Sequence, residues 1–138
     1  MRQHRDEISL RTEGRRLTEI TRRIAGFTED SGIANGLLTA FCRHTTASLL
    51  IQENADPDVQ LDLMDAFARL APEGADWRHG AEGADDMPGH VKAALAPASL
   101  SIPIIDGALA LGTWQGVYLA EWRAAGRQRR VLLHAIGD

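Results

Sequence analysis

Two segments of the chain carry residue types that could bind a metal ion or a phosphate. The first, Arg43 to Asp58, reads RHTTASLLIQENADPD and puts a histidine beside small hydroxyl residues on an expected strand, before an Asn-Ala-Asp-Pro corner. The second, His79 to His90, reads HGAEGADDMPGH and mixes histidines with carboxylates. Neutral imidazole is a common metal ligand, and hydroxyl groups can donate to phosphate oxygens. If the fold joins the two segments, the chain carries a metal or phosphate site.

The second segment has the more specific spacing. Asp86 and His90 are four residues apart, so on a helix they share one face. His79 could reach the same place through the preceding loop, and His44 of the first segment would make a third imidazole. Three histidines with nearby carboxylates suit zinc or a similar divalent ion, whereas carboxylates alone suit magnesium. The spacing matches no standard zinc motif such as HExxH, so it leaves the metal site as one possibility.

Much of the first segment also has a purely local explanation. Asn54 can shape the turn, and Asp56 can cap the helix that follows. His44, at a strand end, could be structural or simply exposed. The same corner presents a helix N-terminus, which attracts anions. Four residues could hold a phosphate: Arg43, Thr45, Thr46 and Lys92.

A third piece, Leu111 to Arg123, reads LGTWQGVYLAEWR. Two glycines bracket Trp114 and Gln115, which predicts a turn or bulge that presents these side chains. Trp114 could stack on a heteroaromatic ring, or it could simply cover the core. Glu121 falls on an apolar strand face, where a carboxylate needs a partner or a function. Arg123 on the same face could be that partner.

Composition limits the function classes. A length of 138 residues predicts one domain, spanning 1–138, with a real hydrophobic core. A net charge of -4 argues against a nucleic-acid partner. Cys42 is the single cysteine, which excludes an internal disulfide and fits a reducing compartment. No stretch reaches the roughly 20 apolar residues of a membrane span, so we expect a cytoplasmic protein with no membrane partner.

Alternating and apolar runs predict a β-rich chain. The expected strands are Glu7–Thr12, Leu37–Arg43, Thr46–Ile51, Ser99–Ile105, Ala108–Leu111, Val117–Trp122 and Gln128–Ile136. Asp106-Gly107 is a strong hairpin signal, and Pro103 places its strand at an edge or bulge. Leu17–Ser31 is ambiguous, because it starts with strand-like alternation and continues with helical spacing.

Two further stretches of the sequence predict helices. One opens at Asp56-Pro57 and should turn four apolar residues toward the core, namely Val59, Leu63, Phe67 and Leu70. The other runs from Asp86 to Leu95. The fold class is therefore α+β, with mainly antiparallel strands and two or three helices. A long irregular stretch, Ala71 to Asp85, is either a functional loop or a surface loop.

Four runs together resemble the secondary thiamine-phosphate synthase family over roughly Leu37 to Arg130. They are HTTASLLIQENADPDV, DDMPGHVKAAL, SLSIPIIDGALALGTWQGVYLAEWR and the WRH before the acidic loop. The resemblance implies a compact α+β homotrimer and a secondary activity that joins an aminopyrimidine pyrophosphate to a thiazole phosphate. This chain departs from the family pattern mildly, with Gly89 where alanine is frequent and Trp122 where histidine is frequent.

Taken with the resemblance, the candidate residues form three sets. The candidate catalytic residues are His44, Asn54, Asp56, Asp86 and Glu121. The candidate substrate-binding residues are Arg43, Thr45, Thr46, Lys92, Trp114 and Gln115. The candidate metal ligands are His44, His79 and His90, which the resemblance places in one site.

The expected cofactor is a divalent ion, zinc or magnesium, that stabilises a departing pyrophosphate. The expected partners are two further copies of the chain and a small phosphorylated molecule. The chain lacks GxxxxGK[ST] and GxGxxG, which excludes nucleotide-type phosphate cradles. Two alternatives stay open, a non-catalytic trimer that binds a metal or an anion and a metal-dependent hydrolase.

Overall fold

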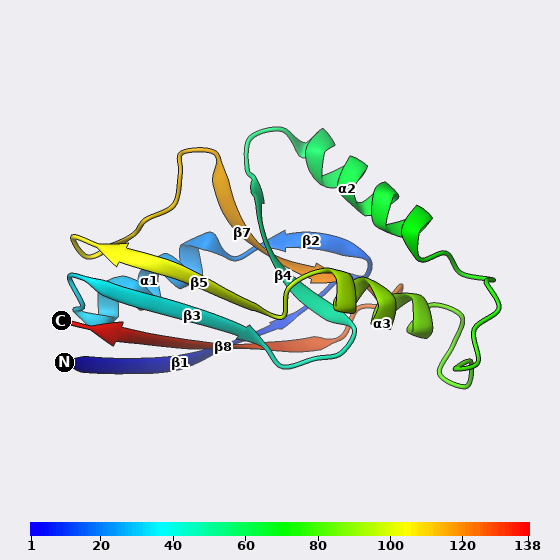
Figure 1. Ribbon diagram of the computed structural model, residues 1–138, viewed down its shortest axis with the longest axis horizontal. Coiled ribbons are helices and arrows are strands. Elements are labelled where there is room, and N and C mark those ends of the chain that lie inside the picture. The colour runs from blue at the N-terminus through cyan, green and yellow to red at the C-terminus, as the bar shows by residue number, and fades with distance from the viewer.

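The computed structural model describes residues 1–138 as two antiparallel sheets and three helices in one α+β domain (Figure 1). The larger sheet has the order β1 (Arg2–Arg11), β8 (Gln128–Gly137), β3 (Gly36–Cys42), β5 (Ser99–Ile105) and β6 (Ala108–Leu109). The smaller sheet has the order β2 (Arg16–Glu19), β7 (Gln115–Glu121) and β4 (Ala47–Glu53). The predicted fold class and antiparallel pairing are confirmed.

The smaller sheet lies between two apolar clusters, so its central strand β7 is buried on both faces. Val117 and Leu119 point into the main core, which the larger sheet also lines. Tyr118 and Ala120 point the other way, into a second cluster that the remaining helices cover. Successive residues of a strand face opposite sides, so a strand buried on both faces must be apolar at nearly every position.

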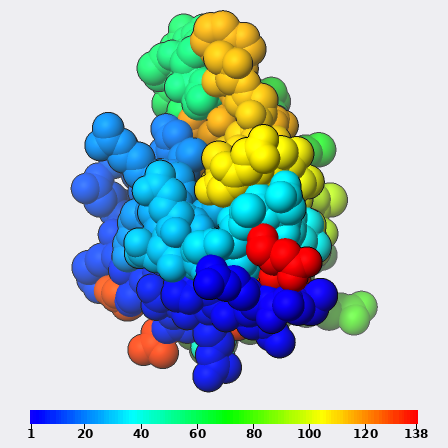
Figure 2. All heavy atoms as spheres, turned by 90° about the vertical axis from the view of Figure 1, so that its left-hand side faces the viewer, coloured from blue at the N-terminus to red at the C-terminus, as the bar shows by residue number.

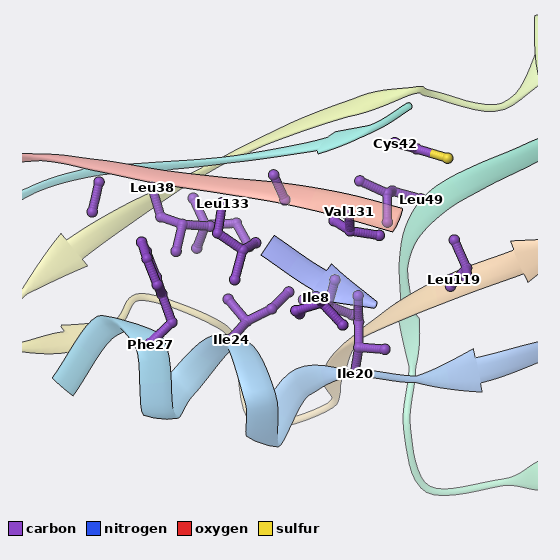
Figure 3. Packing of buried hydrophobic residues seen from close by; sticks show 14 of the residues in the cluster. Ile8, Ile20, Ile24, Phe27, Leu38, Cys42, Leu49, Leu119, Val131 and Leu133 are labelled. Atoms are coloured by element: carbon purple, nitrogen blue, oxygen red, sulfur yellow. The ribbon is translucent and has the colours of Figure 1, made fainter. Parts of the chain in front are cut away.

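Helix α1 (Thr21–Ser31) closes the main core from the side opposite β3 and β8 (Figure 3). Its residues Ile24 and Phe27, with Ile20 just before it, face Leu38 and Leu133 across the core. Their spacing of three and four residues gives one apolar stripe. The ambiguous stretch Leu17–Ser31 therefore contains the end of strand β2 followed by helix α1. Its strand-like alternation and its helical spacing each belong to one of these elements.

Helices α2 (Pro57–Leu70) and α3 (Asp86–Leu95) cover the outer face of the smaller sheet. None of the three helices is long and apolar enough to cross a membrane. The Phe67 ring packs on Trp122, with ring centroids 4.8 Å apart. The predicted bounds of α3 and the opening of α2 at Pro57 are confirmed.

The predicted core face of α2 is wrong in part. No residue of α2 is fully buried, and Leu70 is 66% exposed. The stripe that meets the sheet contains Met64 and Phe67, and Gln60 donates to the Tyr118 hydroxyl at 3.2 Å. Of the predicted stripe, Phe67 packs against the second cluster, whereas Gln60 and Met64 meet the sheet beside Val59 and Leu63, so the contact face is shifted by about one residue.

The hairpin between β5 and β6 forms at the predicted dipeptide. Asp106 and Gly107 both have positive φ, 50° and 80°, which is the backbone that an Asp-Gly turn favours. The strand after this turn is shorter than predicted, since it ends at Leu109. Strand β1 begins earlier than predicted and pairs with β8 along its whole length, so the two termini lie together at one end of the molecule (Figure 2).

A buried ion pair joins the two sheets. Glu121 at the end of β7 has no exposed surface and accepts from Arg129 of β8 at 2.5 and 2.8 Å. The Thr12 hydroxyl and the backbone N–H of Arg123 donate to the same carboxylate at 2.7 and 3.1 Å. Burial alone would raise the pKa of Glu121, but these hydrogen bonds outweigh it and lower that pKa. The partner of Glu121 is therefore Arg129, not the Arg123 side chain predicted from the sequence.

Replacing Glu121 with alanine should lower the free energy of unfolding by about 3–5 kcal/mol, because the Arg129 guanidinium would stay buried without its carboxylate. Urea unfolding at neutral pH measures this change. The matched control is Glu7→Ala, which removes the half-exposed partner of Arg43 and should cost under about 1 kcal/mol. An equally small effect at Glu121 would contradict the role assigned to this pair.

The pair also makes stability depend on pH. The pKa of Glu121 lies below its ordinary value of 4.5 in the folded chain, so the unfolded chain takes up that proton first. The stabilisation is therefore present above that ordinary value and is lost as the pH falls below it. The difference in the free energy of unfolding between the wild type and Glu121→Gln should therefore become smaller as the pH falls below 4.5.

The outer face of the larger sheet has no layer over it within one chain. It exposes Leu37, Phe41 and Ile105, which alternate with buried residues of β3 and β5. An apolar face of this kind commonly marks a protein interface. The predicted homotrimer stays a prediction. From the sequence its contact is expected along the apolar run Ser99 to Leu111 with its Pro103-bearing edge, and the exposed face of β3 and β5 adds Phe41 beside that run.

Sedimentation at micromolar concentration should show a trimer in the wild type. Phe41→Glu should shift the population toward monomer, because it would put a charge into an apolar contact. Thr45→Glu, at an exposed position beyond the end of β3, is the control and should leave the assembly intact. A wild-type chain that sediments as a stable monomer would end the trimer hypothesis.

Candidate metal centre

His79, Asp86 and His90 converge at the N-terminal end of α3. The Asp86 Oδ2 atom lies 2.6 Å from Nε2 of His79 and 3.3 Å from Nε2 of His90. One ligand atom from each residue lies within 4.8 Å of the other two. The two imidazole rings meet edge to face, with centroids 5.5 Å apart. A single ion could contact all three side chains.

Local structure explains how these residues meet. Asp86 and His90 occupy successive turns of α3, as their spacing predicted. His79 comes from the long segment between α2 and α3, which folds back over the start of the helix. Gly83 allows the chain to turn here with a φ of 109°, a backbone conformation that residues other than glycine rarely adopt. The Asp86 N–H then donates to the Gly83 carbonyl at 3.3 Å.

Arg123, which follows β7, ties this region to the sheet. Its Nη1 donates to Asp86 Oδ1 at 2.7 Å, its Nε donates to Asp85 Oδ2 at 2.9 Å, and its Nη2 donates to the Glu82 carbonyl at 2.9 Å. This contact between Arg123 and the two aspartates was not predicted from the sequence. The available signal was an arginine at the end of an apolar strand together with two adjacent aspartates, since a buried guanidinium requires carboxylate partners.

The carboxylates of the site are held in their charged form. Arg123 lowers the pKa of Asp85 to about 2, chiefly through its hydrogen bond. Burial would raise the pKa of Asp86, but the His79 hydrogen bond and the Arg123 charge outweigh it, so that pKa is lowered too. Asp86 is 7% exposed, whereas the side chains of His79 and His90 are 47% and 33% exposed. The carboxylate thus lies at the floor of the site, and the imidazoles border the solvent.

His44 does not belong to this group of ligand atoms. Its Nε2 accepts from the Arg130 N–H of β8 at 2.7 Å, so that nitrogen already has a partner. Burial lowers the pKa of His44, and the Arg129 charge lowers it further. Of the three histidines predicted to converge, two do so, and the third member of the cluster is Asp86. The reason is that His44 follows β3, and its side chain bonds to the neighbouring strand β8.

The Asn-Ala-Asp-Pro corner and the loop before β7 form a separate polar group. They lie beside each other at the top of Figure 1 and Figure 2, away from the start of α3. Asn54 Nδ2 donates to the carbonyls of Thr113 and Gln115, both at 3.3 Å. Gln115 Oε1 accepts from Gly112 N–H at 2.8 Å, and Trp114 is 64% exposed. The contacts of Asn54 and Gln115 are those of a braced turn.

Asp56 has the capping role that its position predicted. Its Oδ1 accepts from the Asp58 N–H at 2.9 Å at the start of α2. Glu121, another of the three carboxylates expected to be catalytic, is fully occupied by the contacts that join the sheets. Of the five candidate catalytic residues, only Asp86 lies in the cluster with His79 and His90.

The four candidate phosphate-binding residues do not form one cradle. Arg43 pairs with Glu7 at 3.1 Å on the surface, and Thr45 is exposed. The Thr46 hydroxyl accepts from Arg129 at 2.9 Å and is buried. Lys92 is 3% exposed, and burial lowers its pKa. Arg43, Thr45 and Thr46 differ because neighbouring residues of an extended chain point to different sides, and Lys92 lies apart from them in the chain, on α3.

The comparisons with known proteins agree with one another. The chain matches the family model described as UPF0047 protein YjbQ-like over residues 6–138. It is 49% identical over 138 residues to UPF0047 protein sll1880 of Synechocystis, covering 99% of this chain and 94% of that one. It is 40% identical to UPF0047 protein YjbQ of Salmonella typhimurium, covering 87% and 85% of the two chains.

Solved structures show the same fold. An uncharacterized conserved protein of the YjbQ/UPF0047 family from Clostridium acetobutylicum superposes with a TM-score of 0.89 at 38% identity. That match covers 95% of this chain and 99% of the other. Hypothetical protein APE1520 of Aeropyrum pernix superposes with a TM-score of 0.90 at 28% identity, covering 98% and 99%.

These findings overturn the predicted identity as a secondary thiamine-phosphate synthase. The matching family is UPF0047 YjbQ-like, and the names of these relatives carry no thiamine chemistry. The predicted transferase activity, which joins an aminopyrimidine to a thiazole, is therefore wrong. Long motifs identify shared positions in a fold, whereas an activity has to be argued from the site itself.

The structure predicts that Asp56 acts on helix stability alone. Asp56→Ala should lower the free energy of unfolding by about 1 kcal/mol, because the Asp58 N–H loses its acceptor. Asp56→Asn should keep most of the stability, since asparagine caps about as well as aspartate. Thermal and urea unfolding of the three proteins measure this. A loss in Asp56→Asn as large as in Asp56→Ala would show that the charge has a further role.

Proposed function

This chain belongs to the UPF0047 YjbQ-like family, and we propose that it binds one divalent transition-metal ion through His79, Asp86 and His90. The proposal rests on one observation, which is that a ligand atom from each of these residues lies within 4.8 Å of the other two. The three atoms that face one another here, two imidazole nitrogens and one carboxylate oxygen, are the atoms that would coordinate the ion.

The chemistry of these ligands favours zinc over magnesium. Magnesium prefers oxygen ligands in octahedral geometry, and this group supplies only one carboxylate oxygen toward the imidazoles. Zinc accepts two imidazoles and a carboxylate readily, and an Fe²⁺ ion also accepts this set. Asp86 stays anionic because its pKa is lowered, so it is available as a ligand near neutral pH.

Three protein ligands leave a coordination position free. Structural zinc sites are closed by four protein ligands, whereas catalytic ones keep a position for water or substrate. The exposed sides of His79 and His90 support access to that position from solvent. A divalent ion bound there would act as a Lewis acid and make its bound water more acidic. A divalent ion and Arg123 would carry three positive charges against the two negative charges of Asp85 and Asp86, which favours a small anion such as phosphate as the exchangeable ligand.

We also infer a reducing location such as the cytoplasm. The support for this is that Cys42 is the single cysteine of the chain, free and buried in the core.

Titration of chelator-treated protein with Zn²⁺ should show one ion bound per chain. Zinc affinity should fall by about 10–100-fold or more in each of three variants, His79→Ala, Asp86→Asn and His90→Ala. Each of them removes a ligand and not merely a supporting contact. Calorimetry with metal analysis of the purified protein measures both stoichiometry and affinity. Zinc at about 100 times its dissociation constant should stabilise the wild type by about 2.7 kcal/mol.

The matched controls are histidines outside the group. His44→Ala and His134→Ala should leave zinc affinity unchanged, since their ring nitrogens bond to Arg130 N–H and to Gln3 instead. Binding should also weaken on acidification, because a protonated imidazole cannot bind a metal. A wild-type chain that binds no divalent ion, or that loses zinc in His44→Ala alone, would overturn the proposal.

A further inference from the structure

We infer that Arg123 is a positioning residue that makes Asp86 a one-oxygen ligand and holds it against the two imidazoles. This inference rests on the metal site proposed above and extends it to a side chain that would not itself touch the ion.

The two oxygens of Asp86 have separate partners. Oδ1 accepts from Arg123 Nη1 at 2.7 Å, and Oδ2 faces Nε2 of both His79 and His90. A free carboxylate can bind a metal through one oxygen or through both. The guanidinium occupies Oδ1 from the sheet side, so only Oδ2 is left toward the site. A charge-assisted hydrogen bond of this kind sets the orientation of a metal ligand.

Arg123 is itself held on every side. Its side chain is 10% exposed, and each of its three guanidinium nitrogens has an acceptor at 2.9 Å or less. Its backbone N–H donates to Glu121, which the Arg129 ion pair fixes between the sheets. The guanidinium therefore has one accessible position. Lysine could not reproduce it, because an ammonium is a point charge without the planar fork of arginine.

The same guanidinium also orders the segment that carries His79. It binds the Glu82 carbonyl and the Asp85 carboxylate, which lie between His79 and Asp86 in the chain. These contacts fix the stretch from Glu82 to Asp86, and the His79 ring bonds in turn to Asp86, so two of the three proposed ligands are placed before an ion arrives. A site held in advance in this way binds more tightly, because less ordering remains to be done on binding.

Three variants test the inference. Arg123→Lys keeps a positive charge but loses the fork, and Arg123→Met removes both. Arg15→Met is the matched control, since Arg15 bonds to Glu73 of the same long segment at 2.7 Å without reaching Asp86. Two measurements are compared across these proteins. One is amide hydrogen exchange of residues 79–86 in chelator-treated protein, and the other is the visible absorption spectrum and affinity of bound Co²⁺.

Arg123→Lys should exchange faster than wild type over residues 79–86 without metal, and it should bind Co²⁺ about 10–100-fold more weakly. Its Co²⁺ absorption should also weaken, because a carboxylate released at Oδ1 can bind through both oxygens and raise the coordination number. Arg15→Met should match the wild type in the Co²⁺ measurements. Should Arg123→Met fail to fold with two aspartates left unpaired, Arg123→Lys still decides the question.

The outcomes separate the inference from the proposed function. Unchanged exchange and an unchanged Co²⁺ spectrum in Arg123→Lys would overturn the positioning role. A weaker affinity with an unchanged spectrum would overturn the one-oxygen assignment. The absence of any Co²⁺ spectrum in the wild type would overturn the proposed metal site, while faster exchange in Arg123→Lys would still support the positioning of Asp86.

Discussion

The burial of the Arg123 guanidinium is the constraint that organises the site end of this molecule. A buried guanidinium is costly unless its donors are satisfied, and here the acceptors come from Glu82, Asp85 and Asp86. The start of α3 and the segment before it must therefore lie over the end of β7. Gly89 faces Thr46 and Arg123 at this contact, where an added Cβ would make ordinary van der Waals contacts at 3.4 and 3.5 Å, so alanine would also fit. One charged side chain thus fixes the position of a helix, a loop and a candidate metal ligand.

Strand β7 can carry this role because it is the most enclosed strand of the fold. Its two faces belong to two different apolar clusters, and its end supplies Glu121 to the ion pair between the sheets. Two arginine–carboxylate systems therefore meet at one point of the backbone, with the Arg123 N–H bonded to the Glu121 carboxylate. Buried networks of this kind stabilise one arrangement only when every member is satisfied, as is the case here for the carboxylates and guanidinium groups. A rigid base beneath an exposed pair of imidazoles is an arrangement suited to metal binding.

The polar residues of this chain divide into two groups with different roles. Asn54, Asp56 and Gln115 use their side chains to brace a corner and a turn. His79, Asp86 and His90 direct ligand atoms at one another, with two of the three side chains open to solvent. The difference is geometric. Residues of the first group bond to backbone groups, whereas those of the second direct side-chain ligand atoms at one another. Only the second arrangement brings together the nitrogen and oxygen atoms that a transition-metal ion accepts.

The amino-acid sequence by itself determined the features that depend on neighbouring residues. These include the Asp56 cap, the Asp106-Gly107 turn, the bounds of α3 and the shared helical face of Asp86 and His90. It also indicated that a carboxylate at Glu121 needs a partner or a function, but the strand alternation suggested Arg123 and gave no indication of Arg129. Only the tertiary structure decided that Arg129 pairs with Glu121, that Arg123 holds Asp86, and that His44 lies outside the metal group. Caps, turns and helical faces are set by contacts within a few residues. The partner of a buried charge depends instead on how whole strands and helices pack against one another.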